Sequence, residues 1–324
     1  MGKIKLLLVV ALAAVFVLAL AAPAMATTHG NYSTTTDACA GCHVAHAAQA
    51  PKLLKVGPTQ TEFCYLCHGQ GTTAAPYDIQ YGLTSGDPTN VNSTAGGFEK
   101  LGGSGGATVT SRHTVWGYDA DANGAAGSWS GEATKTLTVP GGTQNLTGNG
   151  LVCGSCHNPH AGGTGAPNPR LLRTTILGSS NLTVEFTLEP TGVTDGYQVT
   201  EYVSGSTAWC GACHDKFDKP DNSGHELTEG DTMYRHAMDM AATLPGGADG
   251  TIASGTPLET HSTDPDKVAC LTCHRAHGTT ATVSGYALSW PRDNGGTGTT
   301  SALLRMQNRG VCYNCHGAAE YNKP

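Results

Sequence analysis

Six short motifs of the form C-x-x-C-H are the residues of this 324-residue chain whose spacing indicates a definite chemistry. Two thiols three positions apart can form thioethers with the two vinyl groups of one haem, and the histidine that follows can bind the haem iron. The motifs contain all twelve cysteines of the chain, so no thiol is left over for another purpose. The pattern predicts six covalently bound haem c groups.

Two other uses of C-x-x-C fit the pattern less well. A zinc ribbon needs two such pairs per metal and no following histidine. Six disulfides would explain neither the constant spacing nor the histidines. The predicted thioether positions are Cys39, Cys42, Cys64, Cys67, Cys153, Cys156, Cys210, Cys213, Cys270, Cys273, Cys312 and Cys315. The predicted proximal iron ligands are the motif histidines His43, His68, His157, His214, His274 and His316.

Eight further histidines compete for the six distal positions, on the opposite face of each iron. Three of them, His46, His160 and His277, stand three positions after a motif histidine, which makes these motifs doubled. One helical turn later, such a side chain cannot reach the far face of its own haem, but it can reach a neighbouring haem. Each doubled motif is therefore expected to tie two haems close together.

The other distal ligands are predicted in the longer intervals between motifs. His113, His236 and His261 lie there and complete a set of six, so the number of predicted distal ligands equals the number of predicted haems. His29 and His225 are left as alternatives to members of this set. A methionine beside His236 is another alternative ligand, and it would raise the potential of that haem.

The N-terminus has the pattern of a secretory signal peptide. Lys3 and Lys5 precede an apolar run over residues 6–22, and Ala24-Met25-Ala26 follows as a cleavage site. A retained membrane anchor is the alternative, but the run is near the lower limit for a spanning helix. We expect residues 1–26 to be removed and no membrane span to remain. The product is then secreted, at an extracellular or cell-surface location, with the periplasm as the alternative.

Composition indicates how such a chain can fold. Only 13% of the residues are charged and 6% are aromatic, while 44 are glycine and 16 are proline. An ordinary core of this length needs more large side chains, but six porphyrins supply apolar surface and covalent anchors. We expect a multihaem cytochrome c, mostly loops and short helices wrapped around a six-haem core, with residues 27–324 as a single domain. The net charge of −7 argues against a nucleic-acid partner.

Short β-structure is predicted between the motifs. A strand running into Pro140-Gly141-Gly142 predicts a hairpin near residues 134–147, and alternating apolar residues predict a second near residues 181–203. Both are expected to cover haems and carry no catalytic set. Helices are predicted to be mostly single turns that carry the motifs, because glycine and proline interrupt every other candidate.

The order of the motifs resembles a known family. The segments are CAGCHVAH, FCYLCH, CGSCHNPH, WCGACH, CLTCHRAH and VCYNCH. Their order over the whole mature chain is similar to that of the hexahaem extracellular cytochromes that polymerise into filaments, the cytochrome nanowires of the OmcS and OmcE type. The resemblance implies bis-histidine haems in one continuous line of alternating stacked and T-shaped pairs. It also implies that His46 ligates a haem of the adjacent subunit.

These features favour extracellular electron transfer over catalysis. Eight candidate distal histidines for six haems predict saturated irons, whereas a multihaem reductase needs an open position for its substrate. Motifs near both ends of the chain permit a head-to-tail contact between copies, which yields a filament if it does not close into a ring. A monomeric periplasmic shuttle is the alternative. The expected partners are further copies of the chain, and redox proteins or extracellular electron acceptors.

Overall fold

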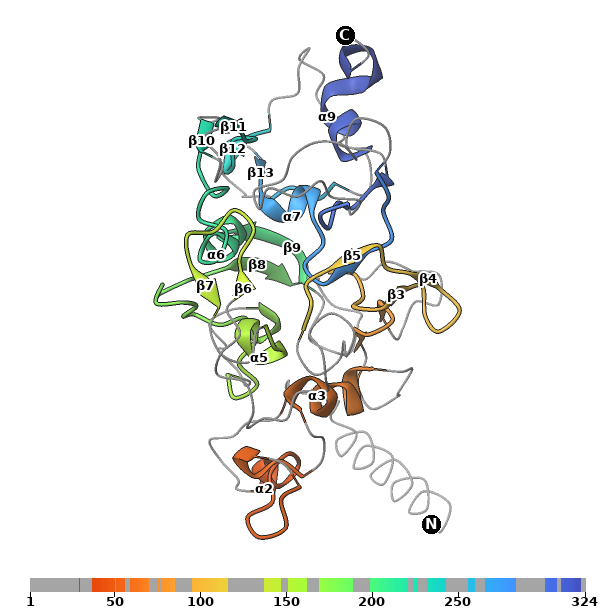
Figure 1. The fold of residues 1–324 in the computed structure, drawn as a ribbon, viewed down its shortest axis with the longest axis vertical. Helices are drawn as coiled ribbons and strands as arrows, with labels where there is room; N and C mark the ends of the chain where they lie inside the picture. The colour runs from red at the N-terminus through yellow and green to blue at the C-terminus, as the bar shows by residue number, and fades with distance from the viewer. Residues whose placement is uncertain are drawn as a thin grey trace, which may run out of the picture.

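The computed structural model is an elongated molecule in which the motif-bearing segments follow one another along the longest axis (Figure 1). Segment α2 lies near one end of this axis and α9 at the other. The structure describes residues 29, 37–49, 51–55, 59–69, 75, 77–84, 95–115, 137–146, 151–161, 169–188, 199–220, 224–226, 232–242, 256–259, 266–283, 301–307 and 310–321. The predicted signal peptide, residues 1–26, lies outside these ranges.

All six α-helices in the described ranges contain at least the first cysteine of a C-x-x-C-H motif. They are α2 (Asp37–Ala40), α3 (Gln60–His68), α5 (Cys153–Cys156), α6 (Ser206–Gly211), α7 (Cys270–Cys273) and α9 (Gly310–Tyr321). Two short 3₁₀ segments, η1 (Pro51–Leu53) and η2 (Pro169–Leu171), follow the first and third motifs. The prediction of short helices is confirmed for four of the six. α3 and α9 are longer than single turns. Among the described residues, no helix has the length and apolar character to cross a membrane.

The described strands form seven antiparallel pairs and no larger sheet. The pairs are β1 (Tyr77–Asp78) with β2 (Leu83–Thr84), β3 (Lys100–Leu101) with β4 (Ala107–Thr108), β5 (Ser111–Arg112) with β14 (Gly278–Thr279), β6 (Leu137–Thr138) with β7 (Asn145–Leu146), β8 (Glu185–Leu188) with β9 (Val199–Ser204), β10 (Gly224–Glu226) with β11 (Thr232–Tyr234), and β12 (Met240–Ala241) with β13 (Lys267–Val268).

The two predicted hairpins are present as the β6–β7 and β8–β9 pairs. The other five pairs were not predicted. Their strands have only two or three residues, which is too short for an alternating pattern to appear in the sequence.

A small apolar cluster lies where α3 meets the β3 region. Tyr65, Phe98 and Val115 form it, and each is buried. The ring of Phe98 stacks on that of His277, with centroids 4.5 Å apart. Among the described residues, this apolar cluster therefore touches a predicted haem ligand.

The N-cap of α3 is a first place to test the packing around a motif. The buried Thr59 hydroxyl accepts a hydrogen bond from the Glu62 amide at 3.2 Å. We expect Thr59→Ala to lower the free energy of unfolding by about 1 kcal/mol, because it removes this cap. Thr59→Ser keeps the acceptor and should cost less. Chemical denaturation of the intact protein measures both, and equal losses in the two variants would contradict the capping role.

Candidate haem sites

Four of the six motifs close on themselves through a backbone hydrogen bond. The amide of His43 donates to the carbonyl of Cys39 at 2.8 Å, and His157, His214 and His274 make the same bond at 3.0 Å. In two motifs a spacer hydroxyl also caps the turn. Ser155 Oγ accepts from the amide that precedes its motif, and so does Thr272 Oγ1, both at 3.0 Å. These contacts set the relative positions of the two thiols and the imidazole within each motif.

Five of the six proximal histidines have Nδ1 within hydrogen-bond distance of a backbone carbonyl. The pairs are His43 with Lys52 (2.9 Å), His68 with Tyr77 (3.3 Å), His157 with Arg170 (2.8 Å), His214 with Pro140 (2.6 Å) and His274 with Ala302 (2.8 Å). A carbonyl can only accept, so Nδ1 carries the proton and donates it. Nε2 is then left with a lone pair for a metal, which is the usual arrangement around metal-bound histidine.

Burial keeps several of these imidazoles neutral. It lowers the pKa of the proximal His157 and His274 and of the distal candidate His113. For His277, burial followed by the nearby His157 and His113 lowers the pKa to about 3. A neutral imidazole is the form that binds a metal, so these side chains are in the required state at neutral pH.

The imidazole rings meet in five pairs, each of a motif histidine with a histidine from elsewhere in the chain. The ring centroids are 5.9 Å apart for His68 with His29, 6.0 Å for His43 with His160, 6.1 Å for His214 with His113, 6.3 Å for His157 with His277 and 6.3 Å for His316 with His236. Metal–nitrogen bonds of about 2 Å on opposite faces of one ion put two imidazole centroids about 6 Å apart. The residues therefore fit an iron held between two histidines.

The pairing of β5 with β14 positions two of these partners together. His113 follows β5, His277 precedes β14, and the His113 amide donates to the His277 carbonyl at 2.9 Å. The His113 Nδ1 lies 2.6 Å from the Ala276 carbonyl. Gly96, with a φ of 81°, allows its segment to lie against Gly278, because a Cβ there would meet the Gly278 carbonyl. Segments far apart in sequence thus bring two distal candidates side by side.

Five histidines outside the motifs each face a motif histidine. His113, His160, His236 and His277 each face a motif histidine, and so does His29, which the sequence left only as an alternative. His46 is exposed and faces no motif histidine among the described side chains. His225 lies on β10, and His261 lies outside the described residues.

One motif histidine differs from the other five. Within the described part of the chain, no imidazole faces His274 at this separation. His274 has the same Nδ1 contact as the others, so its Nε2 is equally prepared for a metal. His274 is thus the motif histidine that has no facing imidazole within the described part of its own chain.

Thiols of consecutive motifs are neighbours along the molecule. Cys64 lies beside Cys153, and this neighbour, followed by burial, raises the pKa of Cys64. Cys210 lies beside Cys270 in the same way, and the pKa of Cys210 is raised. Between the remaining consecutive motifs the interaction is electrostatic. It is the second cause, behind burial, of the raised pKa of Cys42, Cys156 and Cys273. These pairs are Cys42 with Cys67, Cys156 with Cys213, and Cys273 with Cys312 and Cys315. The six motifs therefore form one ordered series.

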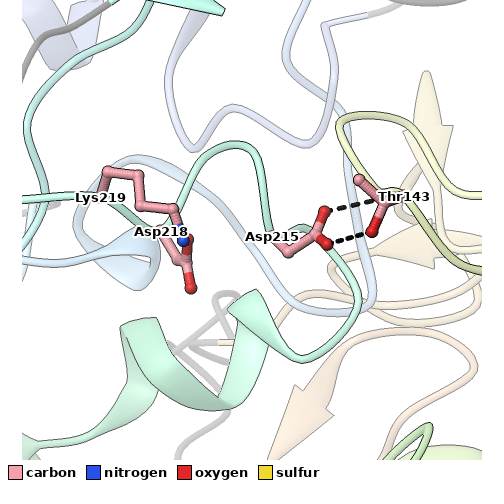
Figure 2. Close-up of polar contacts among 4 residues, drawn as sticks. All are labelled: Thr143, Asp215, Asp218 and Lys219. Atoms are coloured by element: carbon pink, nitrogen blue, oxygen red, sulfur yellow. Dashed lines mark hydrogen bonds and ion pairs between the residues drawn. The ribbon is translucent and has the colours of Figure 1, made fainter.

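The β6–β7 turn is held against the fourth motif by an aspartate (Figure 2). Asp215 follows His214 directly, and its carboxylate accepts from the amide of Thr143 at 2.8 Å and from the Thr143 hydroxyl. The same turn supplies the Pro140 carbonyl that accepts from His214. The Lys216 amide completes the contact by donating to the Gly141 carbonyl at 2.9 Å. This hairpin is therefore a second support for a proximal histidine.

We expect Asp215→Ala to loosen this turn. The variant loses both bonds to Thr143, so the Lys216 amide should exchange its hydrogen with solvent faster than in the wild type. Hydrogen exchange of the intact protein measures this effect. Lys219→Gln is the matched control, because it removes only the surface ion pair with Asp218, seen beside the turn in Figure 2. Unchanged exchange at Lys216 in Asp215→Ala would show that the carboxylate does not hold the turn.

Comparison with known proteins gives one family match. Residues 29–73 match the family model described as the doubled CXXCH motif. This segment contains the first two motifs and also His29, the ring partner of His68. The motifs and their twelve cysteines indicate covalently bound c-type haem.

Two solved structures are similar to the chain at low identity. One is that of the OmcS nanowires from Geobacter sulfurreducens, with 19% identity, a TM-score of 0.42, and coverage of 86% of this chain and 98% of that chain. The other is the outer membrane cytochrome S filament from Geobacter sulfurreducens, with 19% identity, a TM-score of 0.40 and the same coverage. No curated protein matches the chain.

Proposed function

We propose that this chain transfers electrons outside the cell through six bis-histidine c-type haems, as the subunit of a conductive filament. The observation that carries the proposal is the set of five imidazole pairs whose centroids lie 5.9–6.3 Å apart. When bound, the haems supply one-electron redox chemistry, and the chain supplies spacing, burial and axial ligands. With both faces of each iron occupied, no position is left for a substrate, so the protein is an electron carrier and not an enzyme.

The proposed ligand set follows the ring pairs. The twelve motif cysteines form the thioethers, and the six motif histidines are the proximal ligands. His29, His113, His160, His236 and His277 are the distal ligands of five haems. Only the distal position opposite His274 is then left. Two of the predicted distal ligands, His46 and His261, remain for it.

We assign this last position to His46 of a neighbouring copy. His46 is exposed and follows α2, at one end of the long axis, whereas His274 follows α7 in the opposite half of the molecule (Figure 1). The resemblance assigns His46 to a haem of the adjacent subunit, and the separation of α2 from α7 along the long axis supports this assignment (Figure 1). Donation of His46 to the next subunit makes a head-to-tail contact, and such a contact continues into a filament. Ligation and assembly are then one event.

The order of the thiol contacts supports a continuous line of haems. The cysteines of each motif lie beside those of the next motif, from the first motif to the sixth. Residues 1–26 support secretion, with the extracellular space or cell surface as the location. The electron donors and acceptors are then other redox proteins or extracellular acceptors.

Electron microscopy of the purified extracellular fraction tests the filament. We expect uniform thin filaments built from this chain. Discrete particles that still contain six low-spin haems would instead indicate a monomeric periplasmic shuttle.

A spectrum of the reduced protein with carbon monoxide tests the coordination. We expect almost no change in the assembled protein, because every iron already has two histidines. A large change in the intact assembly would indicate an open iron and favour a multihaem reductase.

A further inference from the structure

Three segments of similar sequence return to the three doubled motifs in the same conformation. They are residues 51–55, 169–173 and 301–305, and each ends in Leu-Leu followed by a basic residue. The loops that lead to them differ greatly in length. The shared conformation therefore comes from the contacts with the motifs and not from the connections.

The backbone contacts of the three return segments are equivalent. The motif histidine pairs with the second leucine in an antiparallel bridge, as His43 with Leu54, His157 with Leu172 and His274 with Leu304. The residue after the histidine donates its amide to the first leucine, at 2.8, 2.7 and 2.8 Å in chain order. The final basic residue donates its amide to the second motif cysteine, at 3.0, 2.9 and 2.9 Å. Each segment thus holds its motif on both sides of the histidine.

Each return segment contains two consecutive non-glycine residues in the left-handed region. The φ values are 61° and 61° for Lys52 and Leu53, 52° and 57° for Arg170 and Leu171, and 50° and 64° for Ala302 and Leu303. Such residues are uncommon, and a consecutive pair is rarer still. The carbonyl of the first accepts from Nδ1 of the proximal histidine, and the carbonyl of the second accepts from the next amide. The left-handed pair is therefore what directs both carbonyls at the motif.

Two of the segments add a side-chain contact to the same motif. Arg173 Nε donates to the Gly154 carbonyl at 2.5 Å, and Arg305 Nε donates to the Leu271 carbonyl at 2.6 Å. Both carbonyls belong to the residue after the first cysteine of the motif. The unfavourable backbone conformation persists because the surrounding contacts determine it.

We propose that the left-handed pairs are positioning elements that keep the Nδ1 proton of three proximal histidines engaged and so lower the reduction potentials of the first, third and fifth haems. This inference rests on the proposed function, since it concerns the haems assigned there. A hydrogen bond from Nδ1 strengthens Nε2 as a donor, and a stronger donor favours the oxidised iron. The pairs thus act on potential through the proximal histidine, whose Nδ1 they contact.

Substitutions that change only the backbone preference test this role. Leu53 is 51% exposed, so its replacement removes little packing. Leu53→Val opposes a positive φ, because a β-branched side chain disfavours that region, whereas Leu53→Asn and Leu53→Gly favour it. Ala302→Val and Ala302→Asn make the same comparison at the third segment. Mass spectrometry of the full chain first counts the attached haems, and potentiometric titration then resolves their potentials.

We expect each valine variant to raise one of the potentials, with about a tenfold higher ratio of reduced to oxidised haem, which corresponds to about 59 mV for one electron. The asparagine and glycine variants should match the wild type. Six attached haems with unshifted potentials in the valine variants would overturn this inference alone. Equal shifts in the asparagine variants would also overturn it, because packing would then be the cause. A wild-type chain without haem would overturn the proposed function as well.

Discussion

In the His46→Ala variant, we expect filaments to disappear and discrete subunits with six attached haems to accumulate. His46 is exposed near the α2 end of the molecule, and His274 is the proximal histidine without a ring partner in the described part of the chain. Loss of the donated imidazole removes the bond that joins one copy to the next. It also leaves one iron per subunit with an open position, which should bind carbon monoxide when reduced.

Added imidazole separates the two consequences of this variant. Free imidazole can occupy the open position and restore the low-spin spectrum, but it cannot link two subunits. We therefore expect spectral recovery without filaments. His261→Ala is the control and should retain both filaments and spectrum. If His46→Ala still forms low-spin filaments and His261→Ala binds carbon monoxide, then His274 takes its distal ligand from its own chain.

The double variant Cys153→Ser, Cys156→Ser should have the second large effect. It removes the covalent anchors of the third haem, so mass spectrometry should find five attached haems. His157 and His277 are buried and neutral, and without the cofactor their rings would border an empty space. We expect the free energy of unfolding to fall by about 5 kcal/mol or more, since a porphyrin is larger than the aromatic side chains whose removal costs 3–5 kcal/mol.

The same change at the C-terminal end provides the comparison. Cys312→Ser with Cys315→Ser should also give five haems, but α9 lies at the end of the molecule and less of the interior depends on it (Figure 1). Its loss of stability should be smaller, as thermal unfolding can show. In filaments, the central variant should also interrupt conduction, because it removes a middle member of the series. A stability loss equal at both positions would contradict an interior supported mainly by the central haem.

The chemistry within each motif could be derived from the sequence because it depends on five consecutive residues. The thioether positions and proximal histidines need no knowledge of the fold. The β6–β7 and β8–β9 hairpins were also predictable, since their turns and alternation are local. The return segments were not singled out, although Leu-Leu-Lys and Leu-Leu-Arg recur after the doubled motifs. Their role depends on a left-handed backbone and on contacts across loops of unequal length.

The pairing of distal with proximal histidines could not be predicted from short sequence motifs. Counting histidines indicated that eight candidates serve six positions, but it did not place His29 beside His68 or leave His274 without a partner in the described residues. A distal histidine has to approach an iron from a different part of the chain, so its identity depends on which segments meet in space. The sequence alone determined how the haems attach and which residue types surround them. Tertiary structure decided which imidazoles face each other and how the motifs follow one another, because both depend on long-range contacts such as the pairing of β5 with β14.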